Sequence, residues 1–137
     1  PTVPHVGRPS FDLADDEVEI GIGIHGEPGR HRIPAASADE IAQMLLDPVV
    51  DDLGLGSGES VLLFVNGMGG TPQSELYVVY RQARRLLEGR GVTVARSLVG
   101  SYVTSLEMQG ASVTVLRLDD ELTQLWDAPV RTAALHW

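Results

Sequence analysis

The 137-residue sequence predicts an α/β domain of two layers, in which helices cover a mixed β-sheet. The main reason is that segments with strand character alternate along the chain with segments of helical periodicity, the order found in α/β folds. A second reason is the segment SVLLFVN at residues 60–66, an almost continuous apolar run typical of a buried strand. With 43% apolar residues, a chain of this length has enough apolar side chains for a single core.

The chain divides into a short connector and one domain. Residues 1–16 are rich in proline and polar side chains, and we expect them to form an extended linker. Residues 17–137 then form the domain. Because the sequence opens on Pro1 without an initiator methionine, we expect the chain to be a piece of a longer protein.

The domain begins with a strand, a loop and a helix. Residues 17–24 alternate β-branched residues with small or polar ones, as a half-buried strand does, and the turn-rich segment GEPGRHRIP follows as a loop. Ser37 and Glu40 have the spacing of a capping box, in which each side chain bonds to the other residue's backbone N–H at a helix start. Proline disrupts helix interiors, so we expect this helix to end near Pro48.

The rest of the chain predicts strand, helix, strand, strand and a short helix. After the strand at 60–66, the segment GMGGTPQS leads into a long amphipathic helix whose apolar residues recur at helical spacing: Leu76, Val79, Tyr80, Ala83 and Leu87. Gly91 ends this helix, and residues 92–100 and 112–120 are the remaining strands. DELTQLWD at 120–127 forms a last helical turn or two before an extended C-terminus, whereas SYVTSLEMQGA is ambiguous between a short helix and a bend.

Composition argues against several functional classes. The net charge of −9 opposes nucleic-acid binding, which needs a basic surface. Without cysteine the chain has no thiolate catalyst, disulfide or cysteine-based zinc site, and its four histidines do not recur at metal-ligand spacing, so we expect no metal site. All ten basic residues are arginine, which leaves no lysine for a Schiff base or a phosphate-binding loop. No apolar run approaches membrane-spanning length and no signal segment opens the sequence, so we expect a cytoplasmic protein.

His25 is the first candidate functional residue. If the alternation of residues 17–24 continues, the His25 side chain shares a face with Gly21 and Gly23, where no side chain crowds it. The α/β folds place their chemistry at strand ends and in the loops beyond them, and a neutral imidazole is a competent nucleophile. The alternative is that His25 only caps the rigid turn formed by residues 26–29.

Three further segments contain residues that could carry chemistry. The run VNGMGGTPQS can present backbone N–H groups to an anion, or its glycines can simply allow a tight connection between strand and helix. In YVTSLEMQG, no base stands near Ser105 in the sequence to activate its hydroxyl, so packing or an interface is its expected role. Clustered carboxylates could hold a divalent cation or, as the simpler interpretation, solvate the start of the first strand: Asp15, Asp16, Glu17 and Glu19.

Four segments, taken in order, resemble the second domain of the substrate-binding subunit of dihydroxyacetone kinases: PSFDLADDEVEIGIGIHGEPG, VNGMGGTPQSELYVVY, EGRGVTVARSLVGSYVTSLEMQGASVTVL and LWDAPVRTAALHW. The resemblance extends across essentially the whole chain, and the last segment is most similar to the bacterial phosphotransferase-dependent form. In this family, the histidine of the GIHGEPG motif attacks the carbonyl carbon of dihydroxyacetone and forms a covalent hemiaminal. That histidine matches His25.

The resemblance implies that His25 is both the catalytic and the substrate-binding residue. On this interpretation, Gly21 and Gly23 make room for the ketone beside the strand. We expect Glu27 to orient the imidazole or to meet the partner domain, and the alternative is that Glu27 is only an exposed residue of the turn. The domain binds no cofactor itself, because the phosphoryl donor, an ADP-carrying helical subunit or ATP, is supplied elsewhere. The intact protein is expected to be a homodimer that includes the family's first domain, so this chain alone is expected to be inactive.

One position departs from the family pattern, because Asn66-Gly67 stands where the family commonly has two asparagines. No side-chain role is therefore carried over to the second position. The alternative function comes from another class: a binding or regulatory domain of the same fold, which holds a ligand or a protein partner without turnover.

Overall fold

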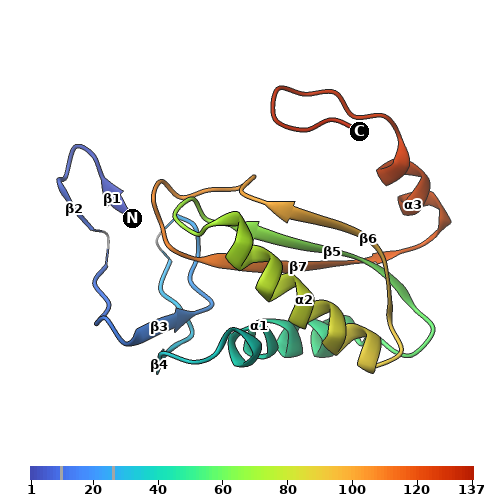
Figure 1. The fold of residues 1–137 in the computed structure, drawn as a ribbon, viewed down its shortest axis with the longest axis horizontal. Helices are drawn as coiled ribbons and strands as arrows, with labels where there is room; N and C mark the ends of the chain where they lie inside the picture. The colour runs from blue at the N-terminus through green and yellow to red at the C-terminus, as the bar shows by residue number, and fades with distance from the viewer. Residues whose placement is uncertain (10, 26) are drawn as a thin grey trace.

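A three-stranded mixed sheet forms the centre of the fold (Figure 1). The computed structural model describes residues 1–9, 11–25 and 27–137. In the sheet, β5 (Ser60–Gly67) lies between β6 (Thr93–Gly100), to which it is parallel, and β7 (Ala111–Leu118), to which it is antiparallel. The predicted α/β fold with a mixed sheet is confirmed, and so are the three strands that build it.

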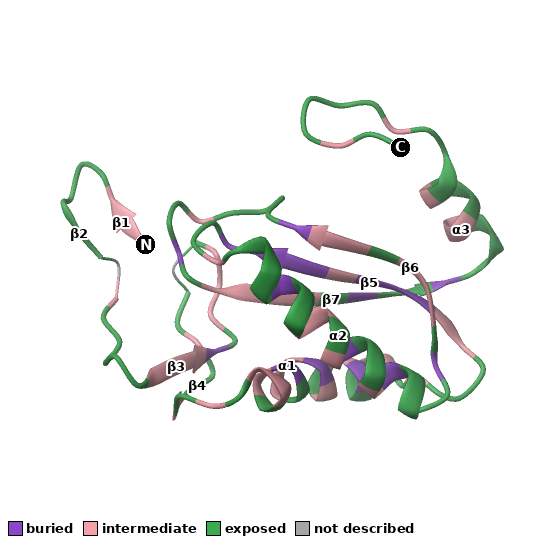
Figure 2. Cartoon of the chain, in the orientation of Figure 1, coloured by how far each residue is buried: buried purple, intermediate pink, exposed green. Residues whose placement is uncertain are grey.

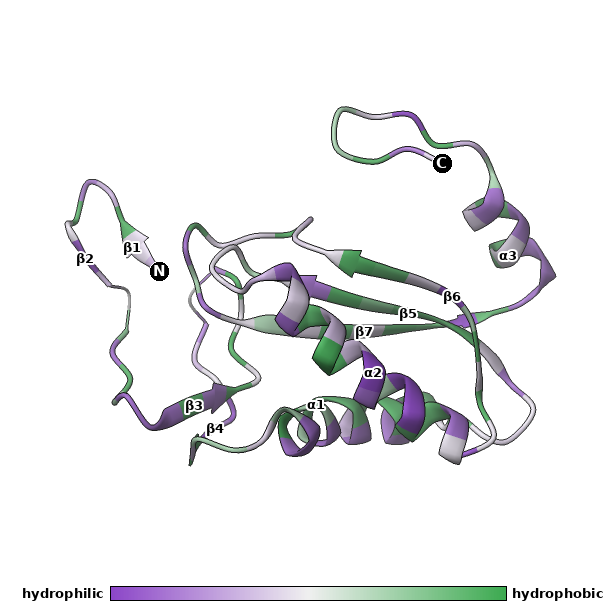
Figure 3. Ribbon diagram, in the orientation of Figure 1, coloured by the Kyte–Doolittle hydropathy of each residue, from purple (hydrophilic) through white to green (hydrophobic). Residues whose placement is uncertain are grey.

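Two helices, α1 (Ala38–Leu53) and α2 (Gln73–Gly89), pack against each other and cover one face of this sheet (Figure 1). The alternate residues of β5 that face them are fully buried, as expected for a central strand: Val61, Leu63 and Val65. Figure 2 shows buried positions on β5 and along the inner stripes of both helices, and Figure 3 shows that the same strand is largely hydrophobic. Burial of this shared apolar surface is the main stabilising contribution to the domain.

Helix α1 begins as predicted and ends later than predicted. The Ser37 hydroxyl accepts a hydrogen bond from the Glu40 backbone N–H, and the Glu40 carboxylate accepts one from the Ser37 N–H, so the capping box is confirmed. The expected end near Pro48 is wrong, because the helix continues to Leu53 and stops at Gly54, where φ is +58°. The turn after Pro48 places Val50 in the core, and this burial offsets the hydrogen bond that proline cannot donate.

The first predicted strand is shorter than the sequence pattern suggests. β3 covers Glu17–Ile20 instead of residues 17–24, because Gly21 adopts a left-handed conformation with φ at +79°. The chain turns there, and β4 (His31–Pro34), which was expected to be loop, pairs with β3 in antiparallel register, with Ile20 opposite His31. The result is a separate two-stranded hairpin whose connection, residues 21–30, we call the 21–30 loop.

Both ends of the chain form small structures outside the main sheet. The expected linker contains a short hairpin in which β1 (Thr2–Val3) pairs with β2 (Arg8–Pro9). At the other end, α3 (Asp120–Asp127) confirms the predicted short helix and is capped by the Asp119 carboxylate. No helix within the described residues is both long enough and apolar enough for a membrane span.

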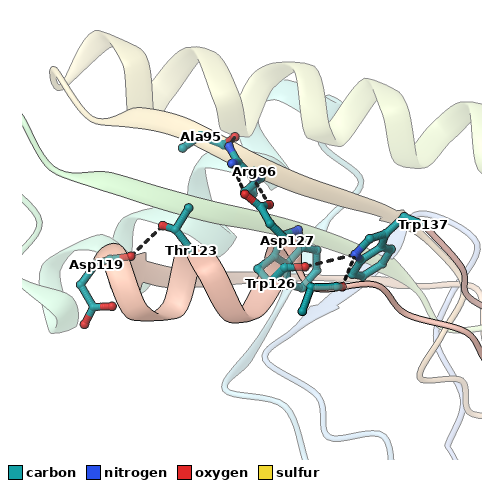
Figure 4. A network of polar contacts seen from close by, with 8 residues as sticks. Ala95, Arg96, Asp119, Thr123, Trp126, Asp127 and Trp137 are labelled. Carbon is teal, nitrogen blue, oxygen red and sulfur yellow. Dashed lines mark hydrogen bonds and ion pairs between the residues drawn. The ribbon is translucent and has the colours of Figure 1, made fainter.

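An ion pair joins α3 to the sheet, and aromatic stacking with hydrogen bonds holds the chain end on α3 (Figure 4). The Arg96 guanidinium donates to both oxygens of Asp127, at 2.6 and 2.5 Å, and this pairing joins α3 to β6. The Trp137 indole stacks on Trp126 with 5.0 Å between ring centroids, and its N–H donates to the carbonyls of Trp126 and Ala128. The chain end therefore folds back onto α3.

The end of α2 provides a matched pair of glycine substitutions. Gly91 has φ at +76°, and a Cβ there would lie 2.4 Å from the Ser57 hydroxyl oxygen, so Gly91→Ala is expected to lower the free energy of unfolding by about 1–2 kcal/mol or more. Gly89 ends the helix with open space around it, so Gly89→Ala should raise the free energy of unfolding by about 0.4–1 kcal/mol. Urea unfolding measures the free energy of unfolding of both variants. If both substitutions raised it, or both lowered it, the assigned helix end would be contradicted.

Candidate functional site

The candidate site lies at the end of the sheet where β5 and β6 both terminate. The chain after β5 and the segment after β6, residues 101–110 (the 101–110 loop), meet there. The Met68 N–H donates to the Gly110 carbonyl, the Gly70 N–H donates to the Met108 carbonyl, and the Ser105 N–H donates to the Met68 carbonyl, at 3.0, 2.9 and 2.9 Å. The carboxyl end of a parallel strand pair is where α/β folds usually place functional loops, so this edge suits a site.

Glycines after β5 let the two loops approach closely. Gly69 has φ at +124°, and a Cβ at this position would lie 1.9 Å from the Leu106 carbonyl oxygen. A Cβ at Gly70 would lie 2.5 Å from the Glu107 carbonyl oxygen. Leu106 itself has φ at +53°, a conformation that non-glycine residues rarely adopt. Of the two interpretations of the glycine-rich segment, the tight connection accounts for these contacts.

Asn66 connects the central strand to the 101–110 loop. Its side chain is buried, with 2% of its surface exposed. The amide oxygen accepts the backbone N–H groups of Tyr102 and Val103, both at 2.9 Å, and the amide nitrogen donates to the Val103 carbonyl at 2.8 Å. The sequence alone did not assign this role to Asn66. The signal for this role was present, because an amide at the end of a buried apolar strand must find hydrogen-bond partners.

His25 lies in the 21–30 loop with its side chain 81% exposed. Its Nδ1 is 3.5 Å from a carboxylate oxygen of Glu27, and the Glu27 carboxylate also accepts the His25 backbone N–H at 3.1 Å. Nδ1 thus faces an acceptor, while Nε2 has no hydrogen-bond partner among the described residues. Both residues were candidates from the sequence, and the structure brings them together.

The glycines around His25 serve the loop itself. A Cβ at Gly23 would lie 2.0 Å from a Glu27 carboxylate oxygen, and a Cβ at Gly21 would lie 2.8 Å from the Arg30 Cγ. The space in front of these two glycines, which was expected to be empty, is therefore taken by the side chains of Glu27 and Arg30. The role of the glycines is to admit the Glu27 carboxylate underneath the backbone of the His25 turn.

The Glu27 carboxylate is held in its ionised form. The pKa of Glu27 lies below its ordinary value of 4.5, chiefly because its own backbone N–H donates to the carboxylate, with further contributions from the His25 backbone N–H and imidazole. A negative charge beside Nδ1 favours the imidazole tautomer that carries its proton on Nδ1. That tautomer leaves the lone pair of Nε2 exposed to solvent.

Two carboxylates of the acidic cluster before His25, those of Glu17 and Glu19, make contacts within the hairpin of β3 and β4. Glu19 accepts the Gly29 N–H at 2.9 Å and pairs with Arg32 at 3.3 Å, and Glu17 lies 3.9 Å from the same guanidinium. No group of three or more potential metal ligands lies together among the described residues. Glu17 and Glu19 thus fix β3 against β4 and shape the loop between them.

A cavity of the domain lies apart from His25. It has a volume of about 640 Å³, lies between β3 and the helices, and His25 is not among the residues that line it. Its walls are largely apolar and include Val18, Ile20 and Ile22 on one side and Leu45, Val79 and Met108 on the other. Polar side chains also reach the cavity, among them Thr71, Gln109 and Ser112, but no histidine is among its described lining residues. We assign the candidate site to His25 and its loop, because the exposed imidazole paired with Glu27 lies there.

Comparison with known proteins identifies the family. The Dak1 domain family matches residues 1–134. The chain belongs to the Dak1 domain family. This result agrees with the resemblance found in the four sequence segments, including the one that contains His25.

Curated relatives and solved structures share this domain. The chain is 42% identical to the dihydroxyacetone-binding subunit DhaK of the PEP-dependent dihydroxyacetone kinase of Escherichia coli, over 99% of this chain and 45% of that protein. It is 46% identical to the corresponding subunit of the PTS-dependent dihydroxyacetone kinase 1 of Listeria innocua, over 97% of this chain and 41% of that protein. Among solved structures, it superposes on the dihydroxyacetone kinase operon co-activator DhaQ with a TM-score of 0.85 and 35% identity, over 93% of this chain and 40% of that one. The chain thus spans less than half the length of these proteins.

Removal of the Asn66 amide should destabilise the domain. Asn66→Ala leaves two N–H groups and one carbonyl without their partner, so we expect the free energy of unfolding to fall by about 1–3 kcal/mol. Gln43→Ala is the control, because the exposed Gln43 amide donates only to the partly exposed Asp47 carboxylate and its loss should change the free energy by about 0.5 kcal/mol or less. Urea unfolding measures the free energy of unfolding of both variants. Equal losses would show that the hydrogen bonds of Asn66 stabilise the domain no more than an exposed hydrogen bond does.

The acidity of Glu27 tests the geometry of the His25 turn. Because its folded-state pKa is lowered, the hydrogen bonds of this carboxylate persist at pH 4.5 and are lost as the pH falls through the lower folded-state value. NMR titration of the Glu27 side-chain carboxyl carbon should give a midpoint below 4.5. In His25→Ala the midpoint should rise only in part, since the main donor is the Glu27 backbone N–H itself. A midpoint at or above 4.5 in the unsubstituted protein would exclude the arrangement described above.

Proposed function

We propose that this chain supplies the dihydroxyacetone-binding histidine of a dihydroxyacetone kinase. The observation that carries the proposal is His25, an exposed imidazole in a tight turn whose Nδ1 faces the Glu27 carboxylate. Family membership supports it, as do relatives at 42% and 46% identity whose names describe dihydroxyacetone-binding subunits. No other described histidine is paired with a carboxylate in this way.

The chemistry follows from the two nitrogens of the imidazole. The lone pair of Nε2 attacks the ketone carbon of dihydroxyacetone, a nitrogen–carbon bond forms, and the carbonyl π electrons move onto the oxygen. The oxygen takes up a proton, while the imidazole, now positively charged, releases the proton of Nδ1. Glu27 stabilises that positive charge from 3.5 Å and orients the ring before the attack. The adduct nitrogen has no proton left to lose, so it cannot become an imine, and the bond remains reversible.

Covalent capture explains substrate selection and positioning. Glycerol has hydroxyl groups but no carbonyl, so it cannot form the bond, however well it fits. A covalently held ketone also presents its free hydroxyl in a fixed position for phosphoryl transfer. Part of the entropy loss of a bimolecular step has then already occurred on binding, which lowers the barrier to transfer. We propose that the phosphoryl group comes from a separate ADP-carrying subunit, in line with the PEP-dependent and PTS-dependent relatives; ATP is the other possible donor. The family's first domain and a second copy of the protein complete the enzyme in this proposal.

A second function has an observation in its favour. The structure with a TM-score of 0.85 is an operon co-activator by its name, although the chain covers 40% of it. A regulatory protein would bind the ketone through the same fold and pass on its presence without transferring phosphate. Turnover with a phosphoryl donor therefore separates the two functions.

The test uses the complete encoded protein with dihydroxyacetone labelled with ¹³C at its carbonyl carbon. We expect the ketone signal to be replaced by a protein-bound signal of a tetrahedral carbon, and His25→Ala should abolish both this signal and turnover. His136→Ala is the matched control, since His136 lies in the C-terminal segment, and it should retain both. Unchanged turnover in His25→Ala would refute the covalent role. An adduct without turnover under either donor would favour the regulatory function.

A further inference from the structure

The hairpin that bears His25 is held together mainly by its own hydrogen bonds. The Arg30 N–H donates to the Ile20 carbonyl at 2.7 Å, and the Gly23 N–H donates to the Glu27 carbonyl at 3.2 Å. β3 and β4 form a sheet of their own and share no backbone ladder with the β6-β5-β7 sheet. Backbone pairing therefore shapes the 21–30 loop but does not fix its position relative to the rest of the domain.

Ser105 provides the connection. Its hydroxyl donates a hydrogen bond to the Ile24 carbonyl at 2.8 Å, one residue before His25. Among the described residues, this is the only hydrogen bond or ion pair that joins residues 14–36 to residues 37–137. The other link between the two parts is apolar, through buried Ile20 and the walls of the large cavity. Apolar packing has little directionality, so the hydrogen bond is what can set the orientation of the turn.

Ser105 is itself fixed by the core. Its N–H donates to the Met68 carbonyl at 2.9 Å, and its carbonyl accepts the Met108 N–H at 3.0 Å. Asn66 holds the backbone of the loop two and three residues earlier, and Leu106 follows in its left-handed conformation. The position of the Ser105 hydroxyl is therefore fixed by contacts with the end of the central strand β5, although the hydroxyl belongs to a loop.

We propose that Ser105 is a positioning residue for His25, which transmits the geometry of the β5 end to the imidazole through the Ile24 carbonyl. The proposal rests on the function proposed above, because positioning matters only if His25 reacts. Ser105 does not touch the substrate in this role, and its hydroxyl proton is committed to a carbonyl rather than to a base. A displacement of a reacting group by about 1 Å can reduce a rate about 100-fold, so the loss of this tether should be measurable.

Three variants of the complete encoded protein test the role. Ser105→Ala removes the donor, Ser105→Thr retains a hydroxyl, and Thr104→Ala is the control, because Thr104 is exposed in the same loop and its side chain makes no hydrogen bond within the described residues. We expect Ser105→Ala to reduce kcat and the yield of the ¹³C-labelled ketone adduct by about 10- to 100-fold. Ser105→Thr should restore most of this loss, and Thr104→Ala should behave as the unsubstituted protein.

A measurement without substrate separates this inference from the proposed function. Amide hydrogen exchange of residues 21–30 should become faster in Ser105→Ala, with an unchanged exchange rate in the core strand β5. If the unsubstituted protein forms no adduct, the proposed function fails, whatever position 105 does to exchange. If it forms the adduct, and Ser105→Ala leaves adduct yield and exchange unchanged, the positioning role is wrong. Equal losses in the alanine and threonine variants would also overturn it, because the hydroxyl would then not be the cause.

Discussion

The Asn66 side chain makes three hydrogen bonds to the backbone of residues 102 and 103 at the point where the central strand ends. An unpaired amide buried at this depth would be destabilising, so the strand can end there only if the neighbouring loop supplies a carbonyl and two N–H groups. This requirement determines the path of the 101–110 loop. The loop in turn places Ser105 under the His25 turn and Leu106 against Gly69. The geometry of the candidate site thus depends on the buried amide of Asn66.

The site lies on a part of the structure that is attached weakly to the core. The hairpin of β3 and β4 has its own hydrogen bonds and ion pairs, and most of its side chains remain partly or fully exposed. Elements of this kind open more readily than central strands, and functional loops are commonly found among them. A reacting residue nevertheless needs a defined position. A single directional hydrogen bond, such as the one from Ser105 to the Ile24 carbonyl, can define it while the rest of the loop stays mobile. Glu27 acts at closer range, since its carboxylate is bound to the His25 turn on its inner side.

Local signals in the sequence predicted most of the fold, and contacts between distant residues explain what they did not predict. The apolar run of β5, the periodicity of α2 and the capping box of α1 are local features, and each formed the element expected. The alternation through Ile24 predicted a longer strand, yet a single left-handed glycine at position 21 ended it. Pro48 remained inside α1 because the following turn buries Val50, a fact that depends on where the sheet lies.

The same distinction applies to the candidate site. The position of His25 at the end of an alternating segment was sufficient to single it out, since reactive residues gather at such ends. The expected open face beside it was wrong, because Glu27 folds back into the space over Gly23, and no local pattern records that contact. Ser105 and Asn66 could not be connected to His25 from the sequence, since they are separated from it by 80 and 41 positions and act through backbone carbonyls and N–H groups.

In the function proposed above, dihydroxyacetone is bound by an exposed imidazole and not in the cavity between β3 and the helices, whose walls are largely apolar. A molecule of so few atoms, most of them polar, gains little from burial in an apolar cavity and loses its hydrogen bonds to water there. A reversible covalent bond removes this difficulty, because affinity and selectivity then come from the carbonyl carbon rather than from the surface buried. Such a site can be open in an isolated domain and still discriminate a ketone from an alcohol. On the function proposed above, the same captured ketone would serve a kinase subunit or a regulatory protein of this fold, and only the transfer of phosphate would distinguish the two.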